Sequence, residues 1–312
     1  MIELHAPPAE VFVLPAPPMP PYVTRLQVAA GRDGVSVALH KALTDAGVTT
    51  RVEGDMTVAD EPGEGAIWYG NHRGGVEPIL LGGVFGRLGR SDFHFFGKPY
   101  ALQARVLHGA GPEAWNTILP VYPSRMADPA ARLRLRDRYW RWRLGSYMPT
   151  DEQIREMNNS SQQRATAVVA AGELALIFPT GHVGEALEKR WHHGLGRMTL
   201  ELARRQSEAP LIPFQFDAFS TPQLTLRLLR RVLHLRAKPY EVVLRVAEPL
   251  KPAEVVQHVL DGFSADERAQ AANGDDRVII CGITQFLRRR YVAQFGSPRD
   301  LARLDAETAA TN

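Results

Sequence analysis

A histidine followed five positions later by a carboxylate is the first feature of the sequence that could do chemistry. The segment reads Asn71-His72-Arg73-Gly74-Gly75-Val76-Glu77. A hydroxyl group ionises far above neutral pH, so it needs a positioned base to become a nucleophile, and neutral imidazole is the usual choice. A carboxylate on the other ring nitrogen fixes the tautomer and stabilises the imidazolium as it forms. The glycines allow a tight turn that lets Glu77 reach His72. A structural interpretation stays open, in which a half-buried histidine lies beside a helix-capping glutamate.

An apolar run that ends in a Pro–Gly turn is the second candidate. It reads Ile177-Phe178-Pro179-Thr180-Gly181. Backbone amides at such a turn can hold an anion or an oxyanion, which makes Phe178, Pro179 and Gly181 candidates for that role. The alternative is an ordinary turn at the end of a strand.

Two more segments place an arginine or an apolar wall near a strand. Leu119-Pro120-Val121-Tyr122-Pro123-Ser124-Arg125 ends in a cation that could bind phosphate, or lie in solvent. Pro210-Leu211-Ile212-Pro213-Phe214 has no reactive side chain. Its Leu211, Ile212 and Pro213 are therefore predicted either as core strand or as the wall of an acyl pocket.

The elements that must position these residues alternate between strand and helix. Short strand-like runs, most of them apolar, predict strands at 49–54, 66–69, 93–96, 118–121, 174–178, 211–216 and 242–250. Helical spacing predicts helices at 35–46, 78–88, 162–171, 196–205 and 221–235. The alternation predicts an α/β fold, a single-domain αβα sandwich with a mixed central sheet. His72 would then follow a strand at the carboxyl edge of that sheet, where ligands bind.

The predicted organisation is an arm, a domain and one insertion. Residues 1–24 carry seven prolines and predict an extended N-terminal arm. Residues 25–312 form the predicted domain, which has a helical insertion rich in arginine and tryptophan at about 126–163.

Composition limits the classes of protein that the sequence can represent. A single cysteine, Cys281, excludes a disulfide framework and fits a reducing compartment. No basic, apolar leader is visible, and no apolar stretch approaches the roughly 18 residues of a membrane span. These features predict a cytoplasmic protein that is free or peripheral at the inner face of the membrane. The net charge of +3 comes with no nucleic-acid-binding module, so no nucleic-acid partner is expected.

Taken in order, the four candidate segments resemble the motifs of the glycerolipid acyltransferase family, which includes the 1-acyl-glycerol-3-phosphate acyltransferases. That family carries NHxxxxD, a strand ending in Arg, FPEGTRS and a PIVPV-like strand. The resemblance runs from about Val52 through Leu250 and includes Gly97-Lys98. It implies phospholipid biosynthesis or related lipid metabolism, with His72 and Glu77 as the catalytic pair.

The sequence departs from the family pattern at two places. Glu77 stands where the family has Asp, and Thr180 and His182 replace the Glu and Thr of FPEGTRS. The arginine that grips an acceptor phosphate is missing from that block. The candidates for binding the acceptor or its phosphate are Lys98, Arg125, Thr180, Gly181, Lys189 and Arg190. The departure favours an unusual acceptor, either another lipid or a specialised metabolite.

The resemblance implies direct transfer from an acyl thioester to a hydroxyl, with no acyl-enzyme. Acyl-CoA or an acyl carrier protein would be the donor, and no cofactor or metal is expected. A basic amphipathic helix at 221–235, with Arg227, Arg230, Arg231 and His234 on one side, suits an anionic membrane or an acidic carrier protein. An ordinary surface helix with its leucines on the core is the alternative.

Two rival functions remain from the sequence. A metal-dependent hydrolase would use His72, Glu77, His182, His192 and His193, but their spacing matches no standard metal motif. An inactive acyltransferase fold could instead bind a lipid or a carrier protein, which the altered third segment would favour.

Overall fold

The computed structural model describes residues 21–61, 63–98, 106–107, 109–122, 138–139, 141–142, 149–181, 191–217, 219–233, 235 and 238–311. Seven strands form one sheet within these residues: β1 (Val48–Glu53), β2 (Ala66–Gly70), β3 (Phe93–Gly97), β4 (Ile118–Pro120), β5 (Leu174–Ile177), β6 (Leu211–Asp217) and β7 (Tyr240–Val246). Their order is β1-β7-β6-β2-β5-β3-β4. All neighbours are parallel except β6 and β7, which are antiparallel. The predicted mixed sheet is confirmed.

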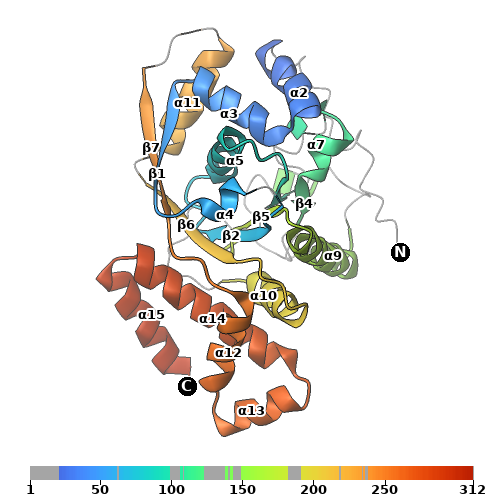
Figure 1. The fold of residues 1–312 in the computed structure, drawn as a ribbon, viewed down its shortest axis with the longest axis vertical. Coiled ribbons are helices and arrows are strands. Elements are labelled where there is room, and N and C mark those ends of the chain that lie inside the picture. The colour runs from blue at the N-terminus through green and yellow to red at the C-terminus, as the bar shows by residue number, and fades with distance from the viewer. Residues whose placement is uncertain are drawn as a thin grey trace.

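The described helices are α2 (Pro21–Asp33), α3 (Val35–Asp45), α4 (Thr57–Asp60), α5 (Glu77–Arg87), α7 (Pro112–Asn116), α9 (Asp151–Ala170), α10 (Gly194–Arg204), α11 (Thr221–Val232), α12 (Pro252–Asp261), α13 (Ala265–Ala272), α14 (Asp276–Phe295) and α15 (Pro298–Thr311). They cover both faces of the sheet (Figure 1). None of them is long and apolar enough to cross a membrane.

Two hydrophobic layers sandwich the sheet, because alternate residues of each strand point to opposite faces. On β2, Trp68 joins the layer that contains residues of α3 and α5, whereas Ile67 and Tyr69 join the layer that contains residues of α9, α10, α12 and α14. The central strand β2 is buried along its whole length. The predicted αβα sandwich is therefore the observed architecture.

Two predicted boundaries are wrong. Helix α2 begins at Pro21, so residues 21–24 are not part of an extended arm; proline is well tolerated in the first turn of a helix. Helix α9 begins at Asp151, inside the predicted insertion, and continues to Ala170. A capping box at Thr150 and Gln153 fixes its start, and its buried side packs beside β4 and β5 as part of the sandwich. Residues 1–20 and most of 126–148 lie outside the described residues.

The C-terminal part of the chain adds helices α12 to α15 on one side of the sheet, drawn in orange to red (Figure 1). Helix α14 lies in the layer formed by α10 and α12, and contributes Ile283, Leu287 and Tyr291 to its core. Tyr291 of this helix also reaches the segment that carries His72.

Candidate functional site

The His72 segment leaves the carboxyl end of β2 and enters α5 within seven residues. The turn depends on Gly75, whose φ of 78° lies in the left-handed region that favours glycine. Helix α5 begins at Glu77 with Pro78 in its first turn, a position where proline is accepted because no intrahelical donor is needed. Glu77 thus lies one tight turn from His72.

The hydrogen bond predicted between the two side chains is present. His72 Nδ1 lies 3.0 Å from Glu77 Oε2, and the second carboxylate oxygen accepts the amide of Gly74 at 2.6 Å. The Glu77 side chain is 2% exposed, whereas that of His72 is 18% exposed. Burial on its own would raise the pKa of Glu77, but the hydrogen bond and charge of His72, together with the amides of Glu77 and Gly74, outweigh it and lower that pKa. The carboxylate is therefore ionised at neutral pH.

Phe178 connects the segment that ends in the Pro–Gly turn to this pair. Its ring stacks on the His72 imidazole with a centroid separation of 4.3 Å and an interplanar angle of 19°. The contact arises because Phe178 and His72 follow the carboxyl ends of the adjacent parallel strands β5 and β2. Within the described part of the chain, His72 Nε2 has no hydrogen-bond partner. The imidazole is thus held on one nitrogen and on one face.

The amides of the Pro–Gly turn do not all serve the predicted role. Pro179 has no amide hydrogen, and the amide of Gly181 donates to the carbonyl of Phe178 at 2.9 Å. Both are therefore poor candidates for oxyanion donors, contrary to the prediction. Thr180 is buried beside them and forms an interaction of its own.

The predicted acyl-pocket wall is a core strand. Leu211 and Ile212 are almost fully buried and belong to opposite hydrophobic layers, and Pro213 is buried between them and Phe214. An open cavity of about 860 Å³ lies farther along the same strand, beside Phe216 and Asp217. The core-strand alternative therefore holds for Leu211, Ile212 and Pro213.

This cavity adjoins the segment that carries His72. It is lined by Arg73 and Gly74 from that segment, by Phe216 and Asp217 of β6, by Tyr240, and by residues 219–223 at the start of α11. Gly74 packs directly on α11, because a Cβ atom there would lie 1.8 Å from Thr221 Oγ1. The cavity thus lies next to the histidine, although His72 is not among its lining residues.

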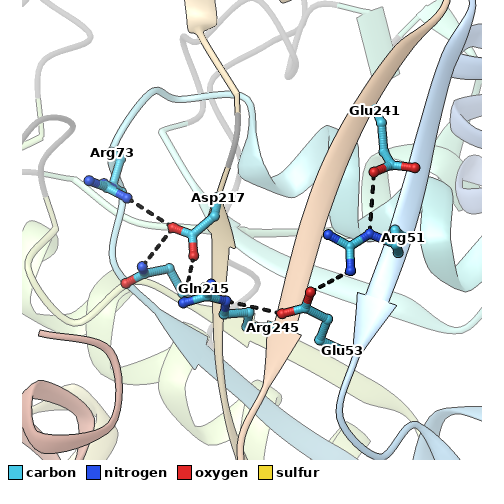
Figure 2. Close-up of polar contacts among 7 residues, drawn as sticks. All are labelled: Arg51, Glu53, Arg73, Gln215, Asp217, Glu241 and Arg245. Atoms are coloured by element: carbon cyan, nitrogen blue, oxygen red, sulfur yellow. Dashed lines mark hydrogen bonds and ion pairs between the residues drawn. The ribbon is translucent and has the colours of Figure 1, made fainter.

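Arg73 is half-exposed at the cavity, and no sequence motif marked it as a functional residue. Figure 2 shows that it begins a chain of charged contacts across β6, β7 and β1. Asp217 Oδ1 accepts hydrogen bonds from Arg73 at 3.4 Å and from Gln215 at 2.9 Å. The other oxygen, Asp217 Oδ2, forms an ion pair with Arg245 at 3.2 Å. The chain continues from Arg245 through Glu53 and Arg51 to Glu241. An exposed ion pair of this length is weak, so Arg73 can turn toward a ligand.

The remaining predicted acceptor-binding residues divide into two groups. Lys98 follows β3 at the same edge of the sheet as His72, is half-buried, and has an interaction of its own. Arg125, Lys189 and Arg190 lie outside the described residues. Among the described residues, no group of three or more His, Cys, Asp or Glu side chains is close enough to hold a metal ion, and His182 is not one of these residues.

A second histidine–carboxylate pair shows what distinguishes the first. His94 lies at the opposite edge of the sheet, near the starts of β3 and β5. Its Nδ1 meets the carbonyl of Asn116 at 3.1 Å and its Nε2 meets Glu173 at 2.5 Å. Both ring nitrogens are engaged, so His94 links elements of the fold and has no nitrogen left to accept a substrate proton.

Tyr291 positions the His72 segment from a distant part of the chain. Its hydroxyl accepts the amide of Asn71 at 3.0 Å and donates to the carbonyl of Phe214 at 3.0 Å. Burial raises the pKa of Tyr291, which keeps the hydroxyl neutral and able to donate. Spacing such as Ile283, Leu287 and Tyr291 indicates a buried helix face, but the partner of the hydroxyl cannot be read from it.

We expect Tyr291→Phe to lower the free energy of unfolding by about 1–3 kcal/mol, because two buried backbone groups lose their partner. Because Asn71 precedes His72, the substitution should also lower kcat of a reaction in which His72 takes part, with little change in KM. Tyr22→Phe is the matched control, since Tyr22 is a buried tyrosine whose hydroxyl bonds to Asp45 in the other helix layer. Equal kcat values for the two variants would remove the positioning role of Tyr291.

The fold and the site define an α/β protein with an oriented imidazole at the carboxyl edge of a mixed sheet. No protein-family model matches the sequence, and no curated protein matches it. Among solved structures, the chain is similar to the 1-acyl-sn-glycerophosphate acyltransferase PlsC from Thermotoga maritima. The two are 14% identical, with a TM-score of 0.35 over 81% of this chain and 79% of that one. At this level of similarity, the chemistry of the chain depends on the geometry of its own site.

Proposed function

We propose that this chain is an O-acyltransferase that moves an acyl group from a thioester to the hydroxyl of a lipid-like or specialised-metabolite acceptor. The observation that carries the proposal is the contact of 3.0 Å between His72 and the buried carboxylate of Glu77. An imidazole oriented in this way, with its second nitrogen available, is suited to take a proton from an alcohol. The order of the four sequence motifs supports the choice of acyl transfer over other base-catalysed reactions.

The reaction balances without an acyl-enzyme. His72 Nε2 takes the proton of the acceptor hydroxyl while its oxygen attacks the thioester carbonyl carbon. The ionised Glu77 stabilises the imidazolium that forms. When the tetrahedral intermediate collapses, the carbon–sulfur bond breaks and the imidazolium returns its proton to the departing thiolate. Acyl-CoA or an acyl carrier protein supplies the thioester, and no cofactor is required.

Two features of the site suit this mechanism. Stacking of Phe178 on the His72 ring keeps water from one face and restricts rotation of the ring. The neighbouring cavity of about 860 Å³ presents Arg73, a cation that can meet an anionic or strongly polar group of the acceptor. Arg73 thus offers a replacement for the arginine that is missing from the third motif.

The experiment measures thiol release from acyl-CoA by the purified chain with a panel of hydroxyl acceptors. The panel includes glycerol 3-phosphate, lysophospholipids, diacylglycerol and simple aromatic and sugar alcohols, and acyl carrier protein replaces CoA in a second series. We expect release to depend on the acceptor and to yield an equal amount of ester, detected by mass spectrometry. Release that is the same without any acceptor would show a thioesterase, and thioester binding without turnover would show a binding protein.

A further inference from the structure

Helix α11 exposes an unusual leucine face. Leu226, Leu229 and Leu233 are 51%, 50% and 58% exposed, and Leu235 just beyond the helix is 55% exposed. The first three follow the spacing i, i+3, i+7 and therefore lie on one side of the helix. We call these four residues the leucine face. They are four of the seven large apolar side chains that are most exposed in the described part of the chain.

The arginines of this helix explain its orientation. Arg227 stacks on Tyr240 at 4.6 Å and donates to the carbonyl of Lys238, and Arg231 stacks on Tyr22 at 5.3 Å near Asp45. These contacts turn two of the three arginines toward the protein. The basic side expected for this helix is therefore divided, because Arg230 is exposed whereas Arg227 and Arg231 contact the protein. Leu224 and Leu228 pack on the core, as the alternative interpretation expected. The surface helices of globular proteins normally direct their leucines inward, so the outward face indicates an apolar partner.

The exposed charge on α11 is positive. Arg230 lies among the leucines on the exposed side, and the helix contains no acidic residue. Exposed leucines with interleaved arginine are the pattern of a helix that lies in the headgroup region of an anionic bilayer. An acidic protein partner would be met mainly by cations, yet leucine dominates this face. A bilayer therefore fits the face better than a carrier protein does.

The helix also connects this face with the cavity. Residues 221–223 line the cavity beside Arg73 and Gly74, and Leu226 follows Thr221 by about 7.5 Å along the helix axis. We infer that α11 docks on an anionic lipid surface, with the leucine face inserted among the lipids and Arg230 at their phosphates. Docking would place the mouth of the cavity close to the bilayer, and it requires no catalytic turnover.

The test is sedimentation with vesicles in the absence of substrate. Vesicles of phosphatidylglycerol and phosphatidylcholine in equal parts should carry down the full chain more than vesicles of phosphatidylcholine alone. The double variant Leu229→Gln/Leu233→Gln should lower the partition coefficient by about tenfold or more, because two leucines lose their burial in the lipid. Both residues are exposed, so the fold and the activity with water-soluble acyl-CoA and acceptor should be retained.

Matched controls locate the effect. Trp142→Gln removes another exposed apolar side chain, which is 74% exposed, and should leave vesicle binding unchanged. Arg230→Gln should weaken binding only to the anionic vesicles, whereas Arg289→Gln, at an exposed arginine of α14, should not. Equal binding by the double leucine variant and the unchanged chain would overturn the inference.

Other occupants of the face would give other outcomes. A dimer in light scattering that the double leucine variant dissociates, with no vesicle binding, would assign the face to a second copy of the chain. Binding of acyl carrier protein that depends on the same leucines, again without vesicle binding, would assign it to that partner. Either result overturns lipid docking but leaves the proposed acyl transfer intact, and loss of acyl transfer would not affect vesicle binding.

Discussion

Replacement of His72 by alanine should lower kcat for acyl transfer by about 10² to 10⁴-fold, because the acceptor hydroxyl loses the base that removes its proton. KM for the thioester should change little, since the imidazole acts on the acceptor. The measurement is thiol release at saturating acyl-CoA with the best acceptor of the panel. Circular dichroism should show an intact fold, because the His72 side chain is partly exposed and its removal leaves no large buried cavity.

His94→Gln is the control for His72→Ala. It alters a second histidine that contacts a carboxylate, but at the opposite edge of the sheet. Its kcat should stay within a few-fold of the unchanged protein. Similar activity of His72→Ala and the unchanged protein would remove His72 as the base and with it the proposed mechanism.

Glu77→Gln should lower kcat nearly as strongly, by about 10² to 10⁴-fold, although it is nearly isosteric. The carboxylate accepts from His72 Nδ1 with one oxygen and from the Gly74 amide with the other. A glutamine has only one side-chain oxygen, so its NH₂ group must face one of these donors. If it faces the imidazole, Nδ1 becomes an acceptor and the ring proton moves to Nε2. Nε2 is the nitrogen that must be unprotonated to take the proton of the acceptor hydroxyl.

Glu77→Asp is the informative companion, because it restores the charge and both oxygens with a shorter side chain. We expect it to recover a substantial part of the activity that Glu77→Gln loses. Loss of activity in Glu77→Asp equal to that in Glu77→Gln would show that the length of the side chain, and not its acceptors, is what matters.

The same pair predicts a pH dependence of stability. The pKa of Glu77 is lowered in the folded protein, so its ionisation favours folding above the ordinary titration range of a glutamate. That contribution is lost as the pH falls through the lowered folded-state pKa. Urea denaturation at a series of acidic pH values should show a smaller decline in stability for Glu77→Gln than for the unchanged chain.

The strands were largely predictable because most of them are short apolar runs between clear turns. Ala66–Gly70 and Leu174–Ile177 are buried on both faces and have no polar interruption. The His72–Glu77 contact was also predictable, because both residues belong to one tight turn. Local spacing is sufficient for such features.

Features that depend on distant residues were missed or placed wrongly. The bond from Asn71 to Tyr291 joins residues 220 positions apart, and no local pattern pairs them. The inward orientation of Arg227 and Arg231 was missed because these side chains stack on aromatic rings of β7 and α2, which no pattern within α11 reveals. Leu211 and Ile212 were expected either in the core or at a pocket, and only the three-dimensional position of the cavity decides between these.

The two hydrogen bonds of the Tyr291 hydroxyl have a consequence for synthesis of the protein. Residues 71 and 291 meet only after α14 has left the ribosome, because α14 supplies the hydroxyl that bonds to the Asn71 amide and the Phe214 carbonyl. Contacts over such sequence distances form late, since a long loop must close before they can form. A nascent chain that still lacks α14 would therefore hold both members of the histidine–glutamate pair without the support that fixes them, so the pair is fully positioned only after α14 has been synthesised.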